Sequence, residues 1–255
     1  MAVRFTHEHS SSRWDRPPAT LEQAARDYAE RAQSLSVTEV ERLKRRQALI
    51  RGLGPGWDTY AGSGNGNGDD TAAGWLGARW RLVYAESYRP TRLRIRRKGS
   101  PVLRDPIHAT IVVLYDTVAR RRMAWAVIHL PSAVERDLAK RHRTARAAQW
   151  LAAARGTKRR LNKLARRYKC HGRAIAADFN INLKRRWARA LLKTLAPRYT
   201  LAWKSMPTGG THGPRLIDAV IYRGQLSAWS QLSPDDDSSD HRPFLTHFTW
   251  TEAHR

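Results

Sequence analysis

Two short segments in the second half of the chain place acidic and hydrogen-bonding side chains beside strand-like runs. They are Ala176-Ala177-Asp178-Phe179-Asn180 and Ser239-Asp240-His241-Arg242-Pro243. Together they offer carboxylates, an amide and an imidazole. Such groups can hold a divalent cation, orient a water molecule and stabilise the charge that develops at a phosphorus atom under attack. The two segments therefore predict phosphodiester chemistry.

Three further short motifs could contribute to the same site. His129 closes an apolar run that begins at Met123, and Asp218 lies in a second apolar run, Leu216 to Tyr222. Near the start of the chain, Glu39 follows the strand-like residues 35–37. Any one of these motifs could arise by chance, but their combination and order make coincidence improbable.

The five motifs resemble, in order, the signatures of the endonuclease/exonuclease/phosphatase superfamily, the metal-dependent phosphoesterases with a DNase-I-like fold. Residues 239–243 match the family's Ser-Asp-His-x-Pro fully, whereas Ala177 replaces a glycine and Thr38 replaces a glutamine. The resemblance implies an α/β fold, a four-layer α-β-β-α sandwich of two packed mixed sheets flanked by helices. A chain of 255 residues suits one domain over residues 1–255. The motif residues are then expected to converge at one rim.

The resemblance also implies catalytic roles. Asp178 would orient and activate the attacking water, and Asn180 would donate to the phosphate oxygens as charge develops on them. His241 would contact the phosphate or assist proton transfer, with Asp218 fixing its tautomer. His129 would be a further phosphate donor or acid.

A metal site is implied as well. Glu39 and Asp240 would supply carboxylates to Mg²⁺ or Mn²⁺, hard cations that prefer oxygen ligands. The family's first strand ends in a Thr-aromatic-Asn triplet, and the matching place in this chain reads Thr6-His7-Glu8. Glu8 could bind the cation in place of the asparagine, although an ionised carboxylate only accepts hydrogen bonds. We therefore expect Glu8 to alter metal preference.

The chain is strongly basic, with a formal net charge of +25. Lysines and arginines cluster in Arg89 to Arg104 and Arg136 to Lys169, and a surface of this sign attracts a polyanion. Codon bias in a GC-rich genome could also raise the arginine content, but it should scatter arginines along the chain. Clustering favours nucleic acid as the partner. The expected phosphate contacts are Arg159, Arg160 and Lys163.

The compartment and assembly are constrained by what the sequence lacks. No apolar run of membrane-spanning length and no secretory h-region are evident, so we expect a cytoplasmic protein with no membrane partner. We also expect a monomer. The single cysteine, Cys170, excludes an intramolecular disulfide. The histidines outside the motifs, among them His7, His9 and His212, show no zinc-binding spacing and are interpreted as structural.

The order of apolar periodicities predicts alternating strands and helices. The expected strands are Val3 to Thr6, Leu35 to Val37, Trp80 to Ala85, His108 to Tyr115, Met123 to Leu130, Arg173 to Phe179, Tyr199 to Trp203, Leu216 to Tyr222 and Phe244 to Trp250. Helices are expected after Thr20, after Val40 and from Ser132 to about Tyr168, the last with a break at Gly156. The glycine-rich residues 62–70 are interpreted as a connector. The ten tryptophans are interpreted mainly as packing residues, with base stacking by Trp57, Trp75 or Trp80 as the alternative.

Three functions remain open at this point. The first is a metal-dependent nuclease acting on DNA or RNA. The second is a phosphatase or phosphodiesterase of the same fold that acts on a small phosphorylated molecule or a lipid headgroup. The third is a catalytically impaired protein that only binds nucleic acid. The shared motifs fit all three, and the basic charge favours a nucleic-acid partner.

Overall fold

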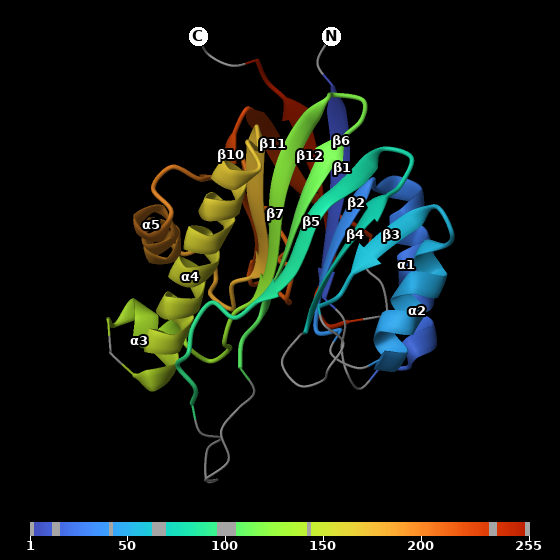
Figure 1. Cartoon of the computed structure of the whole chain (residues 1–255). Coiled ribbons are helices and arrows are strands. Elements are labelled where there is room, and N and C mark those ends of the chain that lie inside the picture. The colour runs from blue at the N-terminus through green and yellow to red at the C-terminus, as the bar shows by residue number, and fades with distance from the viewer. Residues whose placement is uncertain are drawn as a thin grey trace.

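The fold consists of two six-stranded mixed sheets packed face to face, with helices outside each (Figure 1). A computed structural model describes residues 3–11, 16–40, 43–62, 70–95, 106–141, 144–234 and 239–252. The expected four-layer α-β-β-α sandwich is confirmed.

The first sheet has the strand order β11-β12-β1-β2-β4-β3. Within it β1 and β2 run parallel, and the other neighbouring pairs are antiparallel. Its strands are β1 (Arg4–Ser11), β2 (Ser34–Thr38), β3 (Trp57–Tyr60), β4 (Thr71–Leu76), β11 (Leu226–Leu232) and β12 (Phe244–Trp250).

The second sheet has the order β5-β6-β7-β8-β10-β9. Here β7 and β8 are the parallel pair, so both strands end at the same edge of the sheet. Its strands are β5 (Trp80–Tyr88), β6 (Ala109–Asp116), β7 (Arg121–His129), β8 (Gly172–Asp178), β9 (Thr200–Leu201) and β10 (Asp218–Gly224).

The helices cover the outer faces of the sheets (Figure 1). Helices α1 (Pro18–Arg31) and α2 (Leu43–Leu53) lie outside the first sheet. Helices α3 (Glu135–Ala139), α4 (Ala145–Arg167) and α5 (Arg186–Leu195) lie outside the second. Among the described residues, no helix has both the length and the apolar character needed to cross a membrane.

Aromatic side chains fill the space between the sheets. Phe5 stacks on Phe248 with ring centroids 4.9 Å apart and meets the edge of Trp80 at 5.0 Å. Trp75 and Trp80 are each 2% exposed. They pack in the core, as the sequence interpretation favoured, and the alternative that they stack on a nucleic-acid base is wrong. Trp57 packs against the smaller core between the first sheet and its helices.

The predicted break at Gly156 is also wrong, because α4 is continuous through this residue. Glycine is needed at position 156 for another reason: a Cβ there would lie 2.0 Å from the carbonyl oxygen of Pro90. The absence of a side chain lets the segment after β5 run directly over the helix. The actual interruption separates α3 from α4. The sequence patterns also missed α5, β3, β4 and β11, and most of the predicted connector lies outside the described residues.

Candidate active site

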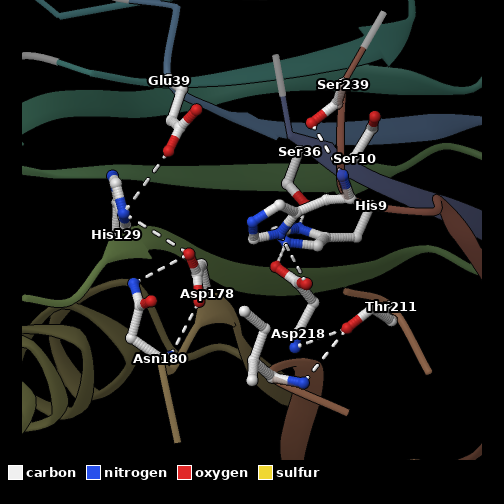
Figure 2. A network of polar contacts seen from close by, with 12 residues as sticks. His9, Ser10, Ser36, Glu39, His129, Asp178, Asn180, Thr211, Asp218 and Ser239 are labelled. Atoms are coloured by element: carbon white, nitrogen blue, oxygen red, sulfur yellow. Dashed lines mark hydrogen bonds and ion pairs between the residues drawn. The ribbon is translucent and has the colours of Figure 1, made fainter. Parts of the chain in front are cut away.

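Three catalytic candidates stand side by side on neighbouring strands of the second sheet. His129 at the end of β7 pairs in register with Asp178 at the end of β8, and Asp178 pairs with Asp218 at the start of β10. Directly opposed residues on adjacent strands present their side chains on the same face about 5 Å apart. The register therefore converts three separate motifs into one row of side chains at the rim (Figure 2).

Asp178 is held by Asn180. The backbone N–H of Asn180 donates to Asp178 Oδ1 at 2.8 Å, and its Nδ2 donates to Asp178 Oδ2 at 2.9 Å and to the carbonyl of Leu130 at 2.8 Å. Both amide hydrogens are thus engaged within the protein. The sequence-based expectation that Asn180 donates to phosphate differs from this geometry, in which Asn180 positions Asp178. The left-handed φ of 52° at Asn180 permits this turn.

His241 and Asp218 form a buried pair. His241 Nδ1 lies 2.9 Å from Asp218 Oδ2, and since the carboxylate can only accept, Nδ1 carries the proton in this bond. The Nε2 atom of His241 is left for a second partner. The Thr211 hydroxyl accepts from the backbone N–H groups of Ile217 and Asp218, both at 3.1 Å, and fixes the start of β10.

His129 is oriented by a residue outside the predicted motifs. Its Nδ1 lies 2.8 Å from Asp70 Oδ2, while its Nε2 lies 3.4 Å from Asp178 Oδ2 and 3.8 Å from Glu39 Oε1. Glu39 follows β2 and has a φ of 62°. This left-handed conformation is strained for a residue other than glycine, and such backbone strain is common at functional sites. The two sheets therefore contribute opposite walls of one site, with Glu39 on one and Asp178 on the other (Figure 2).

The two aspartates of the row differ in charge. Burial, together with the nearby Asp218 carboxylate, raises the pKa of Asp178 to about 7. Burial acts in the same direction on Asp218, but the adjacent His241 outweighs it and holds the pKa of Asp218 far below its ordinary value. At neutral pH Asp218 is a fixed anion, whereas Asp178 is poised to exchange a proton.

The histidines are poised as cations. Burial lowers the pKa of His129, yet Asp70 and Asp178 raise it further, to about 10. In His241 burial is likewise outweighed by Asp218, and the pKa is about 10. Burial raises the pKa of Glu39, and the Asp70 and Asp240 carboxylates add to this rise. An excess of carboxylates facing two protonated imidazoles can accommodate both a divalent cation and a phosphate group.

The comparisons by sequence found no match, whereas the comparison of structures found many. No protein-family model and no curated protein sequence matches this chain. Solved structures match along its full length: an endonuclease/exonuclease/phosphatase family protein from Bacteroides thetaiotaomicron has a TM-score of 0.75 at 12% identity, with 100% of this chain and 99% of that chain covered. This chain has the fold of the endonuclease/exonuclease/phosphatase family.

Two further solved structures have names that describe an activity or a bound anion. A mannosyl-6-phosphatase from the same Bacteroides species has a TM-score of 0.70 at 12% identity, with 96% of this chain and 99% of that chain covered. The human Nocturnin catalytic domain, solved with a bound sulfate anion, has a TM-score of 0.66 at 18% identity, with 98% and 97% covered. The likeness confirms the fold that the motifs implied.

Glu8 does not lie in this cluster. Its carboxylate accepts from Arg31 Nε at 3.2 Å and Nη2 at 3.3 Å, beside α1 on the outer face of the first sheet. Side chains alternate between the faces of a strand, so the inward residues of β1 are His7 and His9. The structure thus does not support the sequence-based assignment of Glu8 as a metal ligand.

Replacing Glu8 with glutamine is expected to destabilise the fold and leave metal affinity unchanged. The carboxylate is fully buried while Arg31 is 28% exposed, so losing this charge-assisted contact should lower the free energy of unfolding by roughly 2 kcal/mol. Chemical denaturation and Mn²⁺ titration of wild type and E8Q measure the two quantities. Weaker Mn²⁺ binding with unchanged stability would show that Glu8 is a metal ligand after all.

A buried imidazole chain leads from the site into the core. His9 Nε2 lies 3.5 Å from Asp218 Oδ1, and His9 Nδ1 lies 2.6 Å from Ser36 Oγ. The same hydroxyl lies 2.9 Å from His7 Nε2. Burial, with His9 nearby, holds the pKa of His7 well below its ordinary value, so His7 is neutral. His9 Nε2 therefore faces the second oxygen of Asp218 without a hydrogen bond between them, a position beside the catalytic row that the sequence interpretation of both histidines as structural did not anticipate.

Asp240 lies at the exposed margin of the site. Its negative charge contributes to the raised pKa of Glu39. His212 Nε2 lies 3.4 Å from Asp240 Oδ2, and the His212 and His241 rings are 5.0 Å apart. His212 was missed because its loop has no motif that links it to the Ser-Asp-His segment.

The predicted phosphate contacts on α4 lie toward the other end of the molecule. Asn162 accepts from Arg173 at the start of β8, and the carbonyl of Tyr168 accepts from Arg122 at the start of β7, whereas the catalytic row lies where these strands end. Arg160 is also committed to Glu86, with contacts of 2.7 and 2.5 Å. The structure does not bring Arg159, Arg160 and Lys163 to the catalytic row.

Proposed function

We propose that this chain is a divalent-metal-dependent phosphodiester hydrolase and that its substrate is a nucleic acid. The observation that carries the proposal is the single row formed by His129, Asp178 and Asp218, completed by His241 and faced by Glu39. The row contains a proton acceptor, protonated donors and a metal-binding carboxylate within one rim, which is a complete set of groups for hydrolysis. Its completeness argues against a catalytically impaired binding protein.

The donor set fits a hard divalent cation. Glu39 and Asp240 would hold Mg²⁺ or Mn²⁺, because hard cations prefer carboxylate oxygens and the negative charge of Asp240 acts on Glu39. When bound, the cation would offset phosphate charge. The protein's own residues provide the other functions.

Asp178 is suited to orient the attacking water and take its proton. Its carboxylate is fixed by Asn180 and its pKa of about 7 matches neutral conditions. His241 presents a protonated Nε2 toward the phosphate, with Asp218 fixing the ring. His129, fixed by Asp70, supplies a second protonated imidazole that can donate to the phosphate or the leaving oxygen.

The proposed substrate class is based on the charge. A net charge of +25 favours a polyanion over a small phosphomonoester. The name of one protein with this fold, the mannosyl-6-phosphatase, indicates a small sugar phosphate as its substrate, so the fold alone does not decide. Assays on plasmid DNA, RNA, mannose 6-phosphate and bis(p-nitrophenyl) phosphate, each with Mg²⁺ or Mn²⁺, test the proposal. If mannose 6-phosphate is hydrolysed faster than DNA and RNA, the substrate is a small phosphorylated molecule and the nucleic-acid proposal is wrong.

The arginines at the catalytic end provide a sharper test of nucleic-acid binding. Strand β5 is antiparallel to β6, which is antiparallel to β7, so the segment after β5 starts at the catalytic edge. Arg92 and Arg94 in this segment are exposed. We expect them to contact a phosphate backbone that enters the site.

Replacing Arg92 and Arg94 with glutamine is expected to weaken duplex binding and to reduce the magnitude of the log-log salt slope by about 1 to 2, since each phosphate contact contributes about 0.9. The matched control is Arg159→Gln with Lys163→Gln, which removes the same charge from exposed positions on α4. Fluorescence anisotropy across a salt series measures both. A larger change of the salt slope in the α4 double variant would show that nucleic acid binds to α4, as the sequence analysis expected.

A further inference from the structure

A second group of possible metal ligands lies next to the catalytic row. It contains His212, Asp240 and His241, and one ligand atom from each lies within 4.8 Å of the others. This composition of two imidazoles and one carboxylate differs from the oxygen ligands around Glu39. Imidazole nitrogen favours transition ions such as Zn²⁺, whereas Mg²⁺ prefers oxygen.

The spacing within this group suits a tetrahedral ion. Zn²⁺ binds histidine nitrogen and carboxylate oxygen at about 2.1 Å, which places neighbouring ligand atoms about 3.4 Å apart. His212 Nε2 and Asp240 Oδ2 are 3.4 Å apart. A surface ion pair between His212 and Asp240 needs no third residue, but here the centroid of the His241 ring lies 5.0 Å from that of His212.

His241 has the outer contact expected of a metal ligand. Histidines that bind metals usually donate their other ring N–H to a carboxylate, which fixes the ring and its tautomer. His241 does this through Nδ1 to Asp218 at 2.9 Å, leaving Nε2 for an ion. The ion displaces the Nε2 proton, the ordinary exchange at a ligating histidine.

The loops that carry the three residues are fixed to each other. The backbone N–H of Arg242 donates to the carbonyl of Thr211 at 2.6 Å, which ties the Asp240–His241 segment to the His212 loop. His212 exchanges two backbone hydrogen bonds with Arg215, at 3.0 and 3.1 Å. A Cβ at Gly210 would lie 2.2 Å from the Arg215 carbonyl oxygen, so only glycine allows this close return of the chain.

We infer that His212, Asp240 and His241 form a binding site for a transition-metal ion of the Zn²⁺ class, next to the hard-cation site at Glu39. The His212 and Asp240 side chains are 38% and 42% exposed, so the ion can enter from solvent and keep an open fourth position. Asp240 would serve both cation sites. His241 cannot donate to a phosphate through Nε2 while that atom binds the ion, so the ion is expected to inhibit the proposed hydrolysis. Binding of this ion does not require that the proposed hydrolysis occurs, so each can fail without the other.

The test uses the full chain stripped of metal and titrated with Co²⁺, which reports its ligands through visible d–d bands. Wild type should bind Co²⁺ with the bands of a four- or five-coordinate nitrogen/oxygen site, and Zn²⁺ should abolish them. His212→Ala should weaken Co²⁺ binding by at least about 10-fold. Glu39→Gln should leave the bands unchanged, because it alters only the hard-cation site.

The control variant is His247→Gln. It removes an imidazole that stacks on Trp229 at 4.0 Å, away from the site, and should bind Co²⁺ like wild type. X-ray absorption at the zinc edge of the wild-type protein adds a measurement that needs no variant and should show two imidazole ligands. Equal Co²⁺ affinity in wild type and H212A, or a zinc spectrum with oxygen ligands alone, would overturn the inference.

Discussion

Asp178→Asn is expected to lower turnover on a phosphodiester by about 10²-fold or more while the protein stays folded. The amide cannot take a proton from water, yet it has the size and nearly the shape of the carboxylate. Asp178 is 1% exposed and both of its oxygens accept from Asn180, so the amide loses one of these hydrogen bonds and should lower the free energy of unfolding by about 1–3 kcal/mol without unfolding the protein. Steady-state kinetics and thermal unfolding of both proteins measure the two effects.

The matched control is Asp58→Asn, which makes the same chemical change at an exposed position on β3 and should retain full turnover. The pH dependence adds an independent signature. The wild-type rate should rise through about pH 7 as Asp178 ionises and fall near pH 10 as His129 and His241 lose their protons. A bound divalent cation should shift the acidic limb lower. A D178N loss of less than about threefold would show that another group accepts the proton.

His241→Ala should have a comparable effect, lowering turnover by about 10²-fold or more. It removes a protonated imidazole that acts on the charge of the reacting phosphate. Because Asp218 acts through His241, Asp218→Asn should reduce turnover strongly in wild type and add little in the H241A background. A double-mutant cycle on kcat measures this dependence. Additive losses would mean that Asp218 contributes separately from the imidazole.

The parts of the site that the sequence predicts are those at the ends of strands. Asp178 and His129 each end an apolar run, so their placement at a rim depends on local pattern alone. Asp218 lies inside the apolar run Leu216 to Tyr222, and only the observed start of β10 at Asp218 brings it to the rim. Their arrangement as one row depends on the register of β7, β8 and β10. Register is a property of paired strands, and a single sequence does not determine it.

The errors have the same origin. Glu8 and His9 are neighbours, and a strand alternates faces at each residue, so a family match shifted by one position exchanges the inward and outward side chains. Asp70 lies at the end of a glycine-rich stretch that resembles a plain connector, although it fixes His129 from 59 positions away. Contacts of this separation require the tertiary fold. The sequence of a long basic helix such as α4 similarly does not show how far its basic residues lie from the catalytic site.

The most direct test of the central claim is hydrolysis by metal-stripped protein with and without added Mg²⁺ or Mn²⁺, measured on plasmid DNA and bis(p-nitrophenyl) phosphate. D178N serves as the parallel sample, so that a contaminating nuclease would be seen in both preparations. We predict no hydrolysis in EDTA, recovery when either cation is restored, and no recovery for D178N. Full hydrolysis in EDTA, or equal rates for wild type and D178N, would contradict a metal-dependent phosphodiesterase acting through this row of residues.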